Sequence, residues 1–245
     1  MMKNILLVVC VCLFAAPIFA QERPASPKKL RVLLVTGEDY PGHLWRDVCP
    51  LIRNNLNTAA DIDCRLADDL EILATDVIFD YDVLVGYFKN YAPLKRDALA
   101  KKNLAAFVEN GGGLVLVHFT CGAFEDWAEF EKLAGRVWDP KLRGHDPHGK
   151  FTVEITDKTH PIVQGVEDFE TTDELYTCLK ASEVPIHVLA ESTSKVDGKR
   201  YPMVFTLEYG RGRTVHTLLG HDTNAVAPPN FIKLLQQAVR WTANK

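Results

Sequence analysis

The chain has 245 residues, of which 24% are charged, and its net charge is −4. No basic stripe with interleaved aromatic residues is present, so nucleic acid is not expected as a partner. Residues 30–245 contain no Pro/Gly/Ser-rich linker and no internal repeat. This predicts one domain that is long enough to bury a sizeable core.

Residues 1–20 have the features of a secretory signal peptide. Lys3 gives the positive start, Ile5–Ala16 is an apolar run, and Ala20 is a small residue at the expected cleavage point. The apolar run is too short for a typical membrane span. Residues 21–29 are polar and predict a short tether. We therefore expect a periplasmic or secreted protein with no stable membrane span after cleavage; an uncleaved N-terminal anchor is the alternative.

Four cysteines remain after the expected cleavage, and their spacing matches no zinc-ribbon pattern. They are Cys49, Cys64, Cys121 and Cys178. An oxidising compartment permits disulfides, but we expect free, buried thiols. Cys121 follows His118 closely, and a thiolate beside a histidine is activated. No Gly-x-Cys-x-Gly elbow surrounds it, so a Cys-dependent hydrolase is the weaker alternative for the function.

Apolar runs and helical spacings alternate along the first half of the chain. The predicted strands are Leu30–Val35, Ile62–Leu66, Tyr81–Val85 and Leu114–His118, and the predicted helices are Leu44–Asn57, Lys95–Asn110 and Ala123–Ala134. In the second helix, Leu99, Phe107 and Val108 are expected to face the core. Gly111–Gly113 precedes a strand, which favours a tight helix-to-strand turn over a phosphate loop.

The last third of the chain is richer in predicted strands. These are Phe151–Ile155, Ile186–Leu189, Met203–Tyr209 and Arg213–Thr217, followed by a closing helix, Phe231–Thr242. The order of elements predicts an α/β fold, in which a doubly wound, mostly parallel sheet is flanked by helices and carries an antiparallel extension.

Polar segments follow several of the predicted strands. His43 follows the first strand, Tyr87–Tyr91 the third, His118 the fourth and His221 the late strand. Ligands of such sheets bind beyond the carboxyl ends of the strands, so we expect one shared rim. For any one of these histidines taken alone, a purely structural role is the alternative to a role in ligand binding.

The loop Arg143–Gly149 adds His145, Asp146 and His148 to these candidates. Imidazole and carboxylate suit zinc and other divalent ions, although a polar surface loop explains the same residues. We expect His43, His118, His145 and His221 as candidate metal ligands. Asp173 and Glu174 are adjacent in sequence and do not share a face, so one of them is expected to point into the rim.

Several motifs together resemble the ThuA-like (trehalose utilisation) family. They are Gly111–His118, Phe124–Trp127, Gly144–Pro147, Asp157–Ile162, Thr172–Tyr176, Gly210–His216 and Leu218–Asp222, which occur in the expected order over residues 31–242. The resemblance implies a flavodoxin-like fold, similar to that of class I glutamine amidotransferases. It also implies a link to catabolism of trehalose and related disaccharides through 3-keto sugars. His118 stands where the amidotransferase nucleophile belongs, so glutaminase activity is not expected.

The resemblance and the polar rim together predict a carbohydrate-processing enzyme (a hydrolase, lyase or isomerase) that acts on glycosides or keto-sugars, with a divalent metal such as zinc as the candidate cofactor. The expected catalytic residues are His118, His221, Asp222 and Glu174, and the expected substrate contacts are Tyr40, Trp45, Tyr91 and Asp146. Trp127 and Trp138 are further candidates for stacking on a sugar, with core packing as the alternative. A non-catalytic sugar-binding or accessory domain is the alternative function. The sequence leaves the oligomeric state open.

Overall fold

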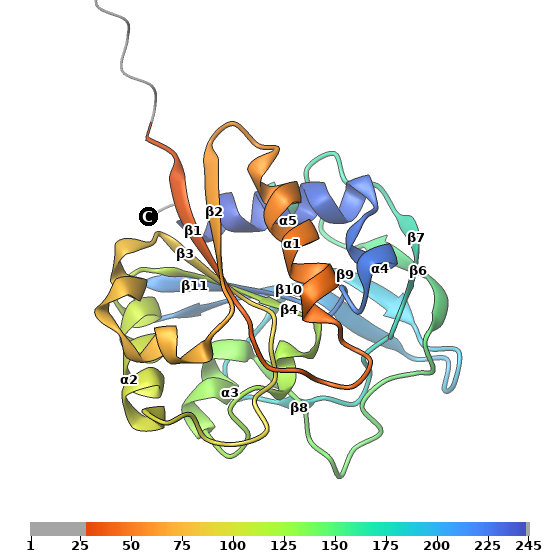
Figure 1. Ribbon diagram of the computed structural model, residues 1–245. Helices are drawn as coiled ribbons and strands as arrows, with labels where there is room; N and C mark the ends of the chain where they lie inside the picture. Colours follow the sequence, from red (N-terminus) through yellow and green to blue (C-terminus); the bar gives the residue numbers. More distant parts are fainter. Residues whose placement is uncertain (1–27, 244–245) are drawn as a thin grey trace, which may run out of the picture.

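A nine-stranded mixed sheet runs through the computed structural model, which describes residues 28–243 (Figure 1). The predicted signal peptide lies outside the described residues. The strands are arranged in the order β2-β1-β3-β4-β11-β10-β9-β6-β7. Their bounds are β1 Leu30–Val35, β2 Ile62–Ala67, β3 Val83–Gly86, β4 Gly113–Val117, β6 Gly149–Ile155, β7 Phe169–Asp173, β9 His187–Thr193, β10 Arg200–Tyr209 and β11 Gly212–Thr217.

The sheet has a parallel half and an antiparallel half. Strands β2, β1, β3, β4 and β11 run parallel. From β11 onward each pair is antiparallel, through β10, β9, β6 and β7. The predicted α/β fold with an antiparallel extension is therefore confirmed. A separate two-stranded sheet pairs β5 (Arg136–Val137) with β8 (Lys180–Ala181).

Helices cover both faces of the parallel half (Figure 1). On one face, α1 (Trp45–Asn57) and α5 (Pro229–Ala243) pack on alternate strand residues such as Val32 and Val115. On the other face, α2 (Asp97–Glu109) and α3 (Ala128–Ala134) pack on the intervening residues, such as Leu33 and Leu114. Burial on both faces explains why the central strands β1, β3 and β4 consist mainly of apolar residues.

The short elements complete the fold. They are the 3₁₀ helices η1 (Leu70–Ala74), η2 (Asp76–Asp80), η3 (His118–Gly122) and η4 (Pro161–Val163), and the helix α4 (Thr223–Val226). Within the described residues, no helix has both the length and the apolar composition needed to cross a membrane.

Two local predictions were wrong. The helix expected at Ala123–Ala134 begins only at Ala128, because Phe124 and Asp126 have φ angles of 48° and 67°, outside the helical region. This turn buries the Phe124 ring against α3, and the Phe124 N–H donates to Asn90 Oδ1 at 2.8 Å. Leu99, expected in the core, is 42% exposed.

Candidate functional site

Three histidines meet where the parallel strands end. His43 lies in the loop after β1, His118 directly follows β4, and His221 lies in the loop after β11. The ring centroid of His43 is 5.1 Å from that of His118 and 4.7 Å from that of His221. The centroids of His118 and His221 are 5.4 Å apart. The structure therefore brings together the three histidines that the sequence placed on one rim.

The antiparallel half of the sheet contributes a carboxylate to this group. Glu174 directly follows β7. Its Oε2 lies 3.5 Å from His118 Nε2 and 3.7 Å from His43 Nε2, and its Oε1 lies 3.5 Å from His221 Nε2. One candidate ligand atom from each of these four residues lies within 4.8 Å of all the others. We call His43, His118, Glu174 and His221 the four-residue cluster.

Backbone carbonyls fix the tautomers of three imidazoles around Glu174. Nδ1 of His118 lies 2.9 Å from Leu218 O, and Nδ1 of His43 lies 3.2 Å from Pro41 O. In His145, Nδ1 lies 2.8 Å from Asp146 O. A carbonyl oxygen only accepts hydrogen bonds, so each Nδ1 carries the proton and, in the neutral ring, each Nε2 keeps its lone pair. Metal-binding histidines are commonly oriented in this way.

The lone pairs of this cluster have no other use within residues 28–243. His43 Nε2, His118 Nε2 and Glu174 Oε2 are buried and have no hydrogen-bond partner there. Buried polar atoms normally have a partner. Tetrahedral zinc with Zn–N distances of about 2.0–2.1 Å separates its ligand atoms by about 3.4 Å. The Glu174 oxygens lie 3.5–3.7 Å from the three Nε2 atoms, and all candidate ligand atoms lie within 4.8 Å of one another. The side chains therefore fit a divalent cation.

Burial and mutual contact also shape the charges of the cluster. Burial, reinforced by the neighbouring His118, lowers the pKa of His43 to about 3. Burial would raise the pKa of Glu174, but contact with His118 and the charges of His118, His145 and His221 outweigh it and lower this pKa to about 2. A neutral imidazole beside an ionised carboxylate is the protonation pattern that a metal site requires.

Two further histidines lie at the edge of the cluster. His145 Nε2 is 3.9 Å from Glu174 Oε2, and the His145 side chain is 32% exposed. His148 and Asp222 form a second, more exposed group around His221, and His148 Nε2 lies 3.6 Å from Asp222 Oδ2. Asp222 also caps α4 by accepting from the backbone N–H groups of Asn224 and Ala225. Its main visible role is therefore to begin that helix.

Asp173 holds the loop that carries His221. This fully buried carboxylate accepts from Gly220 N at 2.7 Å, from Glu174 N at 2.8 Å and from His221 N at 3.2 Å. Gly220 has a φ of 124°, which side chains rarely allow. Both adjacent carboxylates therefore serve the site, although the sequence predicted only one. Burial raises the pKa of Asp173, against the opposing effect of His118.

The predicted substrate contacts separate into two pairs. Tyr40 lies beside the cluster, with its ring centroid 5.2 Å from that of His43, and Tyr91 stacks on Tyr40 at 5.0 Å. The structure does not bring Trp45 or Asp146 to the cluster. Trp45 is buried against the core, and its Nε1 donates to Asp39. Asp146 is buried and accepts from Ser194 Oγ and Lys195 N, each at 3.0 Å, because it anchors a neighbouring loop.

A small cleft opens beside the four-residue cluster. It has a volume of about 50 Å³. Its lining comprises Tyr40, His43, Lys89, Phe119, Cys121, Gly122, Trp138, His145, Glu174 and Tyr176. We call it the metal-side cleft. Aromatic walls and convergent polar groups are typical of a small-molecule site.

Lys89 was missed as a functional residue by the sequence analysis. It follows β3 in the segment Tyr87–Tyr91, and that position was the available signal. Its Nζ forms an ion pair with Glu125 at 2.8 Å and lies 5.4 Å from the ring centroid of Tyr40. A Cβ at Gly122 would lie 2.9 Å from Lys89 Cδ. The absence of a side chain at position 122 therefore leaves room for the lysine to lie along the cleft.

All four cysteines of the described chain are free. Cys121 lines the metal-side cleft but is only 1% exposed, and burial raises the pKa of its thiol to about 12. A thiol of this kind is a poor nucleophile at neutral pH.

We expect native Cys121 to react with iodoacetamide at least about a hundredfold more slowly than in denaturant, and Cys121→Ser to retain metal binding and turnover. Peptide mapping after alkylation, together with assay of the variant, checks this; loss of turnover by a folded variant would restore the nucleophile hypothesis.

Fold and site together define an α/β protein with a histidine-rich centre at the carboxyl edge of its sheet. The model of the ThuA family, described as trehalose utilisation, matches residues 31–242. The chain therefore belongs to the ThuA family, as the sequence motifs indicated. No curated protein matches the chain by sequence.

Solved structures share this fold. A ThuA-like protein from Parabacteroides merdae is 23% identical and has a TM-score of 0.76, covering 89% of this chain and 91% of its own. A ThuA-like protein from Bacteroides uniformis is 18% identical and has a TM-score of 0.72, covering 91% of this chain and 95% of its own. At these identities the likeness concerns the fold.

Proposed function

We propose that this chain is an exported, metal-dependent enzyme that processes carbohydrates and acts on glycosides or keto-sugars. The observation that carries the proposal is the convergence, beside an aromatic-lined cleft, of buried Nε2 and carboxylate atoms that have no hydrogen-bond partner within residues 28–243. Membership of a trehalose-utilisation family supports a sugar as the small-molecule partner. Export is proposed from the N-terminal sequence alone.

In this proposal the four-residue cluster holds a divalent cation such as zinc. When bound, the cation supplies Lewis acidity toward a substrate carbonyl or hydroxyl oxygen. His43 and His118 would direct their Nε2 atoms at the cation, and the Glu174 carboxylate would offset part of its charge. These side chains emerge from different strands, so the sheet holds them in place before any ligand arrives.

The substrate would lie in the metal-side cleft. His145 lines that cleft with the Nδ1 proton held by Asp146 O, so its Nε2 is available to accept a proton from a carbon beside a keto group. Lys89 would donate hydrogen bonds to a sugar oxygen. Tyr40 and Trp138 offer flat apolar surfaces to the C–H face of a sugar ring.

Metal analysis and a turnover screen test the proposal. We expect the dialysed protein to retain divalent metal near stoichiometrically and to convert 3-keto-glycosides. Chelation should abolish turnover and lower Tm, because a ligand present at a hundred times its Kd stabilises the folded state by about 2.7 kcal/mol. Readdition of metal should restore both.

The same measurements separate the alternative function. Metal-free protein that binds sugar with unchanged affinity and turns nothing over would identify a non-catalytic sugar-binding domain.

His160→Ala is a suitable control for the metal and turnover measurements, because His160 caps η4 and packs on Trp241, which belongs to α5. This variant should keep the metal content and turnover of the wild type.

A further inference from the structure

A second, larger groove continues from the metal-side cleft. It has a volume of about 290 Å³, against about 50 Å³ for the cleft. The two share Cys121, Gly122 and Trp138 in their linings. Pockets for small molecules usually measure about 300–1,000 Å³, so the cleft alone is too small to enclose a whole glycoside.

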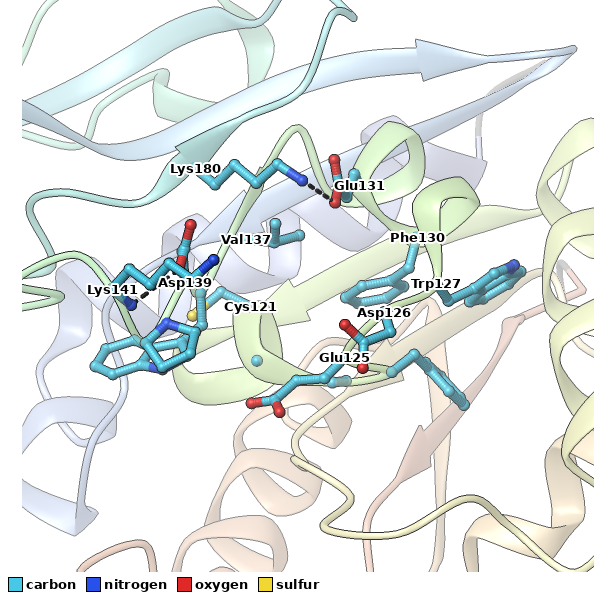
Figure 2. A pocket seen from close by; sticks show the side chains of 15 residues that line it. Cys121, Glu125, Asp126, Trp127, Phe130, Glu131, Val137, Asp139, Lys141 and Lys180 are labelled. Carbon is cyan, nitrogen blue, oxygen red and sulfur yellow. Dashed lines mark hydrogen bonds and ion pairs between the residues drawn. The ribbon is translucent and has the colours of Figure 1, made fainter.

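Charged side chains surround the groove. Figure 2 shows Glu125 and Asp126 on one side, and the ion pair between Lys180 and Glu131 on the opposite side. Four acidic and two basic side chains line the groove: Glu125, Asp126, Glu131, Asp139, Lys141 and Lys180. Lys180 is neutralised by Glu131, and Glu125 is paired with Lys89 of the cleft. The remaining balance of Asp126, Asp139 and Lys141 is acidic.

Trp138 lies at the junction of the two spaces and is held there by the neighbouring loop. A Cβ at Gly144 would lie 2.3 Å from Trp138 Cη2, so the indole packs directly on that backbone. Gly144 precedes His145 of the metal-side cleft. The aromatic ring is thus fixed against the same loop that carries His145, in a position to contact two consecutive units of one ligand.

The backbone that forms the floor of the groove is held in an uncommon conformation. Phe124 and Asp126 have positive φ angles although neither is glycine. The Phe124 N–H is held by Asn90, a residue of the loop after β3. As a result, the acidic pair Glu125–Asp126 faces the groove instead of continuing helix α3 toward its N-terminus.

We propose that this groove binds the leaving-group half of a glycoside and selects a neutral, hydroxyl-bearing ring over an acidic one. The inference rests on the proposed function, because it assumes that the reacting sugar occupies the metal-side cleft. Carboxylates accept strong hydrogen bonds from sugar hydroxyls, and Trp138 supplies the apolar face. A carboxylate on the second ring would meet the net negative charge left by Asp126, Asp139 and Lys141 and would be repelled.

Calorimetric titration of the metal-loaded protein tests the proposal with three probes: a methyl glucoside, a glucosyl-glucose disaccharide and its glucuronic acid analogue. We expect the neutral disaccharide to bind at least about tenfold more tightly than the methyl glucoside, a difference of about 1.4 kcal/mol, since its second ring adds two or more hydrogen bonds. The acidic disaccharide should lose that advantage. With the 3-keto forms of the probes, the same order is expected in kcat/KM.

Two variants test whether the preference for the neutral disaccharide arises in the groove. Asp126→Asn combined with Asp139→Asn should weaken binding of the neutral disaccharide, strengthen binding of the acidic one, and leave the methyl glucoside unchanged. Asparagine tolerates the positive φ of position 126. Asp80→Asn is the matched control, because Asp80 is exposed and precedes β3 at the opposite edge of the sheet. Equal affinity for the methyl glucoside and the disaccharide, or a double variant that changes all three probes equally, would overturn the proposal.

The titration also separates this proposal from the proposed function. If the preference for the neutral disaccharide and its loss in the double variant are observed without turnover of any keto form, the groove is confirmed as a sugar site and the enzymatic proposal fails. If keto-glycosides are converted with no preference for the second ring, the enzymatic proposal stands and the groove proposal fails.

Discussion

Replacing Glu174 by glutamine is expected to reduce metal affinity and turnover by about a hundredfold or more while the protein stays folded. Loss of a side chain that merely orients a metal ligand costs 10–100-fold, and Glu174 is itself the carboxylate on which three imidazoles converge. Glutamine preserves the volume but removes the negative charge. Elemental analysis after dialysis, turnover and Tm measure the outcome.

Glu170→Gln provides the matched control for that experiment. Glu170 lies in β7, the strand that Glu174 follows, but it is exposed. This variant should match the wild type in metal content and turnover. A Glu174→Gln protein that keeps full metal content and activity would show that the cluster is not the metal centre.

Asp173→Ala is expected to produce the largest loss of stability, about 3 kcal/mol in the free energy of unfolding. The substitution leaves three backbone N–H groups without their acceptor, two of them in the loop of Gly220 and His221. Each buried group left unsatisfied costs about 1–3 kcal/mol, and relief of the buried charge offsets part of this total. At about 2–4 °C per kcal/mol for a chain of this size, Tm should fall by about 6–12 °C.

The same variant should weaken metal binding, since Asp173 orders both Glu174 and His221. We expect a loss of about 10–100-fold. Asp168→Ala is the control, because the exposed Asp168 accepts one backbone bond, from Ile155 N at 2.8 Å. It should lower stability by about 1 kcal/mol and leave the metal in place. Equal effects of the two variants on stability would contradict the role assigned to Asp173.

Much of the fold was predictable because its parallel half is buried on both sides. Runs such as Val32–Val35 and Leu114–Val117 are apolar and buried at every position, and their order indicates the topology. Strand β7 was missed because Phe169–Asp173 reads FETTD, with a single large apolar residue. Its place is set by pairing with β6, a long-range contact that local pattern does not contain.

The candidate site, like the fold, was predictable where it depends on the parallel strands and not where it depends on long-range pairing or unusual backbone angles. The rule that ligands bind at the carboxyl ends of parallel strands was enough to group His43, His118 and His221. The sequence also named Glu174 as a catalytic candidate, but its place among the three histidines depends on the pairing of β7, which the local pattern does not indicate. The groove depends on positive φ angles at Phe124 and Asp126, which residue preferences do not indicate.

The four-residue cluster draws its members from loops after β1, β4, β7 and β11, which lie far apart along the chain. In an unfolded chain these side chains are separated by long flexible loops, so their effective concentration around one ion is low. In the proposed metal-bound state, the cation would therefore contribute little to the early steps of folding and would instead hold the two halves of the sheet together once they have formed. Metal identity would then be decided by the ion content of the compartment in which folding is completed, rather than by that of the compartment in which the chain is made.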